Sequence, residues 1–339
     1  MDFVEFGSPI HAIEPAFLEQ EILDCEVKFR SDVNTWPLHF LKKFRASRKF
    51  SDLRMAIQST HRQTELQNKL FTIYSAAFQQ AHASAVRSFR AAIGQPKLLV
   101  LHLSCNERIG LAAESAASFE SVSDYVRHVI VVGCPDREDE YGFSPRGNML
   151  TVPATDAYEG LSQKISLAFR FLGICGNTIP VMKIDDDIRW NASGSELGNV
   201  ISLTLQHHYM GRVVDAAKNG VYRWWHFGRY KSDANNFQPY GLIAACRYAE
   251  GGFGYFVSPT AINVLARASI CFSQSFDAEL SYEDIAVGKV LNSCGLYPHP
   301  FDAVAEGLLI AKPKTSTPMR TVDIVGAPGQ TDSRGFENG

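Results

Sequence analysis

Three consecutive carboxylates, Asp185, Asp186 and Asp187, stand near the middle of the chain. Like charges at such short range repel one another, so a strand end is a poor place for them without compensation. A divalent cation such as Mn²⁺ or Mg²⁺ would compensate, because it prefers oxygen ligands and commonly takes one or two carboxylates together with substrate phosphates. The plain alternative is a solvated acidic turn, the commoner explanation of a bare run of three acids. The apolar residues 180–184 before the triplet and the segment IRW at 188–190 favour a site for a metal ion and substrate phosphates.

A glycine-rich segment, EGGFGYFVS, occupies residues 250–258. Glycines at 251, 252 and 254 suit backbone that passes close to a ligand or adopts a positive φ. An ordinary glycine-rich turn explains the segment equally well. It is neither a Walker loop nor a GxGxxG fingerprint, so it implies neither ATP nor NAD.

Two acids and one histidine near the C-terminal end complete the candidate chemistry. Glu283 and Asp284 open a predicted helix, where one carboxylate would act as general base for an attacking hydroxyl. Acids at a helix start are also common for dipole reasons alone. His299 lies between two prolines that would fix its direction toward a ligand, although a lone histidine is more often structural.

Other side chains could contact a substrate. Lys164 and Arg189 could place positive charge near a bound diphosphate, or could simply lie on the surface. The aromatic segment WWH at 224–226, with Tyr230, could stack on a substrate (an acceptor sugar, if the resemblance described below holds), or form a packed aromatic cluster.

Short apolar runs that alternate with helical stretches must position these residues. Strands are predicted over 97–103, 127–133, 148–153 and 180–184, with helices over 109–119 and 158–172. Alternation of this kind indicates an α/β domain with a largely parallel sheet. Ligands of such sheets lie beyond the carboxyl ends of the strands, and the acidic triplet falls at such an end. Further helices are predicted over 259–268 and 282–293.

The chain divides into three parts. Residues 1–95 are predicted to be a mainly helical region of unknown role, clearest over 65–93, where apolar residues recur at near-helical spacing. The segment GQP at 94–96 ends that pattern. Residues 96–315 form the α/β domain, and the Pro-, Thr-, Ser- and Gly-rich stretch over 316–339 is expected to be a loose tail.

Composition excludes several classes of protein. The 339 residues are 45% hydrophobic and 20% charged, which is typical of a globular fold. The net charge of −3, from 33 basic and 36 acidic residues, provides no global basic field for nucleic acid. Seven scattered cysteines fit free, mostly buried thiols in a reducing compartment. No apolar run approaches the roughly 20 residues that span a bilayer, and no signal peptide is evident.

In order and spacing, several segments resemble the β-1,3-glycosyltransferase family, which includes β3-galactosyl- and β3-N-acetylglucosaminyltransferases, Fringe proteins and the core-1 galactosyltransferase. The segment DAYEGLSQK at 156–164 is similar to D-x-Y-x-N-L-x-x-K, with Gly160 where Asn is usual. KIDDDI at 183–188 resembles K-x-D-D-D-V, and GRV at 211–213 resembles G-K-V. GGFGY at 251–255 with Ser258 looks like G-G-A-G-Y-x-x-S, and EDIAVG at 283–288 resembles E-D-V-x-x-G. The match covers about 150 residues, from 156 to near 301.

The resemblance implies a GT-A fold, a Rossmann-like mixed sheet flanked by helices, and an inverting transfer from a UDP-sugar with Mn²⁺. On that basis Asp187 and His299 would bind the metal, Asp185 would contact the donor, and Asp284 would be the catalytic base. Gly251, Gly252 and Glu283 would belong to the donor-binding site together with Lys164 and Arg189. Asp186 would be a structural acid. The transferred group would be a hexose or N-acetylhexosamine, and the acceptor a glycan hydroxyl, with a β-1,3 linkage.

The chain also departs from the family. Residues 1–95 match nothing in it, no membrane anchor is evident, and the R-x-x-x-R-x-T-W segment is not recognisable, although Arg108 stands near its place. The missing segment leaves the uracil-side contacts and the identity of the donor open. The lack of an anchor predicts a cytoplasmic, bacterial enzyme of surface-polysaccharide synthesis that is soluble or peripheral to the membrane. Two other functions remain open: a non-catalytic nucleotide-sugar or carbohydrate-binding module on the same fold, and a metal-dependent phosphohydrolase. The oligomeric state is open as well.

Overall fold

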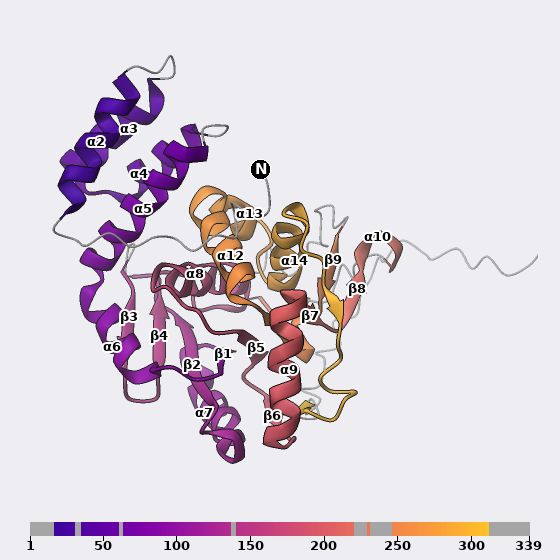
Figure 1. The fold of residues 1–339 in the computed structure, drawn as a ribbon. Helices are drawn as coiled ribbons and strands as arrows, with labels where there is room; N and C mark the ends of the chain where they lie inside the picture. The colour runs from indigo at the N-terminus through magenta and orange to yellow at the C-terminus, as the bar shows by residue number, and fades with distance from the viewer. Residues whose placement is uncertain are drawn as a thin grey trace, which may run out of the picture.

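A mixed eight-stranded sheet forms the centre of the protein, with helices on both faces (Figure 1). The computed structural model describes residues 17–30, 35–60, 64–136, 140–219, 229–230 and 246–311. The strand order is β11-β7-β10-β5-β1-β2-β4-β3. The predicted α/β class is confirmed.

Four neighbouring parallel strands make the middle of the sheet. They are β1 (Leu98–Leu103), β2 (Val126–Gly133), β4 (Met149–Val152) and β5 (Val181–Asp185). All four lie within two residues of the bounds predicted from the sequence. β1 is buried along its whole length, as expected of a parallel strand covered by helices on both faces.

Strands that the sequence pattern did not reveal extend the sheet on both sides. β7 (Tyr209–Gly211), β10 (Tyr255–Val257) and β11 (His299–Pro300) follow β5 on one side, and β3 (Gly142–Ser144) is the opposite edge. β3 and β10 are antiparallel to their neighbours. These strands have two or three residues, too few for an alternating pattern to be recognised.

The helices of the α/β part sandwich the sheet. The residues Leu99, Leu101 and Leu103 of β1 point to the face covered by α8 (Leu161–Ile174) and α12 (Pro259–Cys271). The alternate residues Leu98 and Val100 pack toward the side of α9 (Gly194–His207). α7 (Ile109–Ala117) contacts β1 and β2. α14 (Glu283–Ser293) lies against α12 and α8. These elements make three layers, with the acidic triplet at the end of β5.

The N-terminal region is helical, as predicted. Its helices are α2 (Leu18–Arg30), α3 (Trp36–Ser47), α4 (Phe50–Ser59), α5 (Thr64–Ala81) and α6 (Ala83–Ile93). The helical stretch predicted over 65–93 is therefore two helices, interrupted at His82. Figure 1 shows α2 to α4 reaching away from the sheet at the upper left.

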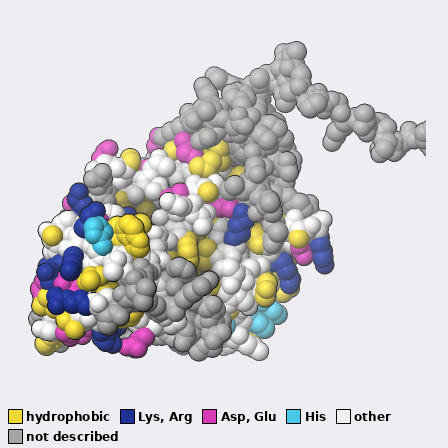
Figure 2. All heavy atoms as spheres, turned by 90° about the horizontal axis from the view of Figure 1, so that it is seen from above, with side chains coloured by type: hydrophobic (Ala, Val, Ile, Leu, Met, Phe, Trp, Pro, Cys, Tyr) yellow, Lys and Arg dark blue, Asp and Glu magenta, His cyan; other side chains and the backbone are white. Residues whose placement is uncertain are grey.

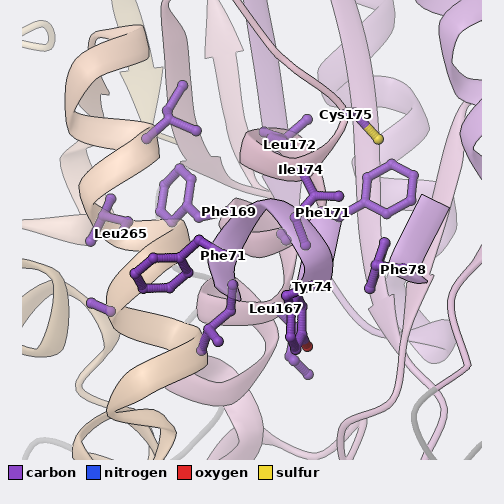
Figure 3. Packing of buried hydrophobic residues seen from close by; sticks show 14 of the residues in the cluster. Phe71, Tyr74, Phe78, Leu167, Phe169, Phe171, Leu172, Ile174, Cys175 and Leu265 are labelled. Carbon is purple, nitrogen blue, oxygen red and sulfur yellow. The ribbon is translucent and has the colours of Figure 1, made fainter. Parts of the chain in front are cut away.

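The N-terminal helices and the sheet share one hydrophobic core. Phe71, Tyr74 and Phe78 of α5 face Phe169 and Phe171 of α8 (Figure 3). The rings of Phe78 and Phe171 lie 6.3 Å apart, edge to face. Apolar residues from α2 to α6 belong to the same buried cluster as β1, α8 and α12. Removal of residues 1–95 would therefore uncover one face of the α/β part.

Smaller elements complete the described chain. They are β6 (Ile188–Trp190), paired with β12 (Leu309–Ala311); β8 (Val213–Asp215), paired with β9 (Arg247–Ala249); α10 (Ala216–Asn219); and α13 (Ser273–Asp277). All seven cysteines are free thiols, four of them buried. None of the described helices is both long and apolar enough to cross a membrane. The tail predicted over 316–339 lies outside the described residues.

Candidate active site

The acidic triplet lies at the carboxyl edge of the parallel strands. Asp185 is the last residue of β5 and stands beside Leu103, the last residue of β1. The side chains of Asp185 and Asp187 are 42% and 35% exposed. The predicted position of the triplet at a strand end is therefore confirmed, and two of its three carboxylates reach solvent.

A buried lysine ties this strand end to the helix that carries the candidate base. The Lys183 side chain is 1% exposed, and its Nζ lies 2.7 Å from Asp185 Oδ1 and 2.5 Å from Glu283 Oε1. The ammonium also faces the ring of Tyr255, 5.7 Å from its centroid. Burial lowers the pKa of Lys183, but the carboxylates of Asp185 and Glu283 more than offset this and raise it above its ordinary value. Lys183 is therefore a fixed cation between β5 and α14.

Gly251 is required by this ion pair. A Cβ at this position would lie 2.3 Å from Glu283 Oε1 and 3.2 Å from Lys183 Nζ, which leaves no room for a side chain. Its carbonyl oxygen accepts a hydrogen bond from Lys183 at 3.4 Å. A Cβ at Gly252 would meet nothing within 4 Å. The close approach expected of the glycine-rich segment thus occurs at Gly251, and its partners are side chains of the protein.

The Asp284 carboxylate is held by backbone donors. The N–H of Gly251 donates to Oδ2 at 3.0 Å, and the N–H of Ile285 donates to Oδ1 at 2.8 Å. Burial raises the pKa of Asp284, and these two hydrogen bonds oppose the rise. Burial also raises the pKa of Glu283, to about 7, against the lowering effect of Lys183. A carboxylate with a raised pKa is a stronger base, which suits proton abstraction from a hydroxyl.

Asp186 has a structural environment. Its side chain is buried, and it accepts a hydrogen bond from Ser104 Oγ at 2.8 Å. Arg108 Nη2 lies 2.6 Å from the other carboxylate oxygen and 3.8 Å from Asp187 Oδ2. Burial raises the pKa of Asp186, while Ser104 and Arg108 lower it. This environment is consistent with the structural role expected of Asp186.

Lys164 contacts the loops that follow the central strands. Its ammonium donates to the carbonyl oxygen of Ser104 at 2.7 Å and lies 3.5 Å from Asp156. The side chain is 1% exposed, and burial lowers the pKa of its ammonium. Asp156 in turn accepts hydrogen bonds from the backbone N–H groups of Asn106 and Gly133, at 2.6 and 2.7 Å. The described geometry makes Lys164 a brace of the loops after β1 and β2, and a contact with donor phosphate stays a prediction.

Gly160, where the resembled family has Asn, follows the loop after β4 that contains Thr155. A Cβ at this position would lie 2.4 Å from the carbonyl oxygen of Thr155. This close approach leaves no space for an Asn side chain. The departure from the family motif therefore has a steric reason.

Arg189 is directed toward α7. Its Nη2 donates to Glu114 Oε2 at 2.9 Å, and its Nη1 donates to the carbonyl oxygens of Ile188 and Asp186, at 3.1 and 3.4 Å. The guanidinium thus supports the turn that follows the triplet. Its predicted contact with a diphosphate also stays a prediction.

His299 is not beside the triplet. It lies in β11, which is separated from β5 by β10 and β7, a lateral distance of about 14 Å. Its ring stacks on His207, with centroids 3.6 Å apart and an interplanar angle of 6°. The Asp187 carboxylate instead lies near Arg108, in the turn that follows β1. Two ligands of one metal ion lie within about 4.5 Å of each other, so the assignment of His299 as the second metal ligand is not supported.

The triplet has too few ligands for a metal site formed by the protein alone, and suits better a metal ion that is bound together with a diphosphate. Among the residues that the structure describes, no three His, Cys, Asp or Glu side chains form a group that could hold a metal ion. Mg²⁺ and Mn²⁺ in nucleotide sites commonly need one or two carboxylates, because phosphate and water supply the other ligands. Asp185 and Asp187, half-exposed at one strand end, meet that smaller requirement.

Three residues near the triplet were missed as site residues: Ser104, Arg108 and Lys183. Ser104 and Arg108 follow β1 directly, so the rule that ligands lie past strand ends could have identified them. The burial of Lys183 has no signal in the sequence, since a lysine in a strand usually points to solvent. For Tyr230, stacking on an acceptor and packing in an aromatic cluster were both open; it is buried, its ring lies 5.6 Å from that of Tyr158, and its hydroxyl lies 2.6 Å from that of Ser281. Residues 224–226 lie outside the described part of the chain.

Comparison with known proteins adds no relative. No protein-family model matches the chain, and a search of curated proteins found no match.

Proposed function

We propose that the protein is an inverting, metal-dependent glycosyltransferase of the GT-A type. It moves a hexose or N-acetylhexosamine from a UDP-sugar to a hydroxyl of a glycan acceptor, in a β-1,3 linkage. The observation that carries the proposal is the Lys183 bridge, at 2.7 Å to Asp185 and 2.5 Å to Glu283. It links Asp185, at the end of β5, to Glu283 at the start of α14, and Glu283 is the neighbour of the candidate base Asp284. This link lies at the edge of the α/β sheet where ligands commonly bind.

In this proposal, the residues of β5 and of the turn after it bind the donor. Asp187, with Asp185 beside it, would hold Mn²⁺ or Mg²⁺ together with the donor diphosphate. When bound, the cation would neutralise the charge that develops on the leaving UDP. Asp185, fixed by Lys183, would contact the donor sugar or ribose, and the backbone at Gly251 and Gly252 would border the donor site.

Asp284, at the start of α14, would act as the catalytic base. Asp284 accepts the proton of the acceptor hydroxyl while the oxygen attacks the anomeric carbon. The bond between that carbon and the diphosphate oxygen breaks, and UDP leaves with the electron pair. Attack from the far side inverts the anomeric centre. The two backbone donors on Asp284 keep its carboxylate oriented during this step.

A pair of substitutions tests the assignment. Asp284→Asn keeps the shape of the side chain but removes the base, so transfer should be abolished while UDP and Mn²⁺ still bind. Asp187→Ala should lose the Mn²⁺-dependent binding of UDP. Asp124→Asn, an exposed acid in the turn before β2, is the matched control and should change neither. Near-normal turnover of Asp284→Asn would refute the base assignment, and unchanged affinity of Asp187→Ala for Mn·UDP would refute the metal assignment.

A thermal-shift screen of nucleotide sugars with Mn²⁺ would identify the donor, because a ligand that binds the native state raises the melting temperature by mass action. The same screen separates the alternatives. A non-catalytic binding module would respond to a nucleotide sugar but show neither transfer nor donor hydrolysis. A phosphohydrolase would cleave simple phosphoesters without a sugar acceptor. Synthesis of a bacterial surface polysaccharide in the cytoplasm is the setting that we propose for the enzyme.

A further inference from the structure

The outward face of α3 is unusual in its composition. Pro37, Leu41 and Phe44 of this helix are buried. Trp36, at 62% exposure, is among the most exposed large hydrophobic residues of the described chain. The twelve residues of α3, WPLHFLKKFRAS, contain three basic side chains and no acid. The solvent face of α3 therefore combines a large exposed aromatic ring with basic side chains.

The exposed Trp36 is continuous with basic side chains and with Phe40, which is half-buried against the core. Trp36 stacks on Phe40 with centroids 5.8 Å apart, and His39 contacts both rings, at 6.0 and 5.4 Å. Lys43 Nζ lies 5.9 Å from the centroid of the Phe40 ring. Lys42 is exposed beside them. We name these five residues the aromatic–basic face.

The charge around this face differs from that of the whole chain. Residues 35–60 contain six Lys and Arg residues and a single acid, Asp52, which makes a net charge of +5 in a chain whose total is −3. Arg45 and Arg48 pair with Glu26 and Glu19 of α2 and so hold α3 in place. Lys42, Lys43 and Lys49 are exposed. Figure 2, which looks down on the molecule, shows Lys and Arg side chains at the left end, interspersed with hydrophobic side chains and with Asp and Glu; α2 to α4 lie on that side in Figure 1.

We propose that the aromatic–basic face docks the protein on the surface of an anionic phospholipid membrane. Amphipathic helices that lie in a membrane interface combine exposed Trp and Phe with Lys and Arg in this way. The exposed Trp36 ring enters the headgroup layer, the half-buried Phe40 supports it, and the lysines are attracted by the anionic lipids. Because the buried residues of α3 pack in the core of the N-terminal helices, the face is formed before it meets the membrane. This inference goes beyond the proposed transfer reaction and does not depend on it.

Sedimentation with lipid vesicles tests the proposal on the full chain. The protein should bind vesicles of phosphatidylcholine mixed with phosphatidylglycerol at low salt, and should bind pure phosphatidylcholine vesicles weakly. Added salt should release it, because the attraction is screened. Lys42→Glu with Lys43→Glu should weaken binding at least about 30-fold, since each lysine near an anionic surface contributes about a fivefold change. Trp36→Ala with Phe40→Ala should weaken binding too, even at low salt.

The control is a pair of charge reversals elsewhere. Arg87→Glu with Arg146→Glu, on α6 and in the turn between β3 and β4, changes the net charge equally and should keep vesicle binding. Thermal melts show whether each variant is folded. Three results would overturn the proposal: no binding of the native protein to anionic vesicles, equal loss in both charge-reversal pairs, or binding that survives both changes to the face. Binding to polyglutamate but not to vesicles would assign the face to an acidic protein partner and refute the lipid docking.

Discussion

Replacing Lys183 by Met would test the centre of the candidate site. Methionine has a similar length and suits a buried position, but it removes the ammonium that lies between Asp185 and Glu283. The Glu283 side chain is 8% exposed and would stay in the interior without its cation. Breaking a buried ion pair from one side costs about 3–5 kcal/mol of folding free energy. Asp185 adds little to this loss, because its half-exposed side chain is solvated.

The pH dependence sharpens this expectation. Burial already raises the pKa of Glu283 to about 7 in the presence of Lys183, and without the lysine the pKa should rise further. We therefore expect the loss of stability to be largest at pH 8, where the carboxyl would have to ionise, and smaller at pH 5.5, where it is protonated. Urea unfolding followed by circular dichroism at both pH values measures the difference.

Two further variants make the reasoning refutable. Adding Glu283→Gln to Lys183→Met removes the lone charge, so most of the lost stability should return. Lys28→Met breaks a pair of the same chemistry on the surface, Lys28 with Glu65 at 2.8 Å, and should leave the unfolding free energy close to that of the native protein. A loss of less than about 1 kcal/mol for Lys183→Met at pH 8, or no recovery in the double variant, would show that the pair is not a buried, coupled unit.

Gly251→Ala should destabilise the protein by about 1–3 kcal/mol, because its Cβ would overlap Glu283; Gly252→Ala, which has free space, should be nearly neutral, and equal urea midpoints for the two would contradict the steric argument. Glu283 has a folded-state pKa above its ordinary value, so its contribution to stability is fully present below about pH 4.5 and is lost as pH rises toward 7. Glu283→Gln should flatten that part of the stability curve, and an unchanged curve would refute the pKa. Burial lowers the pKa of His128 to about 4 and that of His102 as well. Stability should therefore fall as pH drops from 6.5 toward 4, less so in His102→Phe, as urea midpoints across that range would show.

Much of the architecture followed from local sequence patterns. The runs KLLVLHL and PVMKI are short and apolar, which favours buried strands, and the structure has them as β1 and β5. The Pro at residue 259, directly after Ser258, marks the start of α12, whose Ser258 cap accepts the N–H of Ala261. Because a strand end is where a parallel sheet presents its ligands, the triplet could be placed without coordinates.

From the sequence, residues could be assigned to one site only where they directly follow a central strand. Ser104 and Arg108 could have been recognised in that way, whereas β7, β10 and β11 were too short to be seen. Because those strands were not predicted, the distance between His299 and β5 across the sheet could not be predicted either. The order of motifs suggested that His299 joins Asp187, and the sheet instead places two strands between β5 and β11.

By itself, then, the sequence determined the α/β class, the central strands and the position of the triplet at the edge of the sheet, because these depend on apolar periodicity and on residues close together in the chain. Only the tertiary structure decided the partners across the site. Lys183 and Glu283 are a hundred residues apart, and their contact at 2.5 Å depends on how α14 packs against the sheet. The need for glycine at 251 follows from that contact alone. Such relations have no local pattern, because long-range packing brings the groups together and burial then sets their charges.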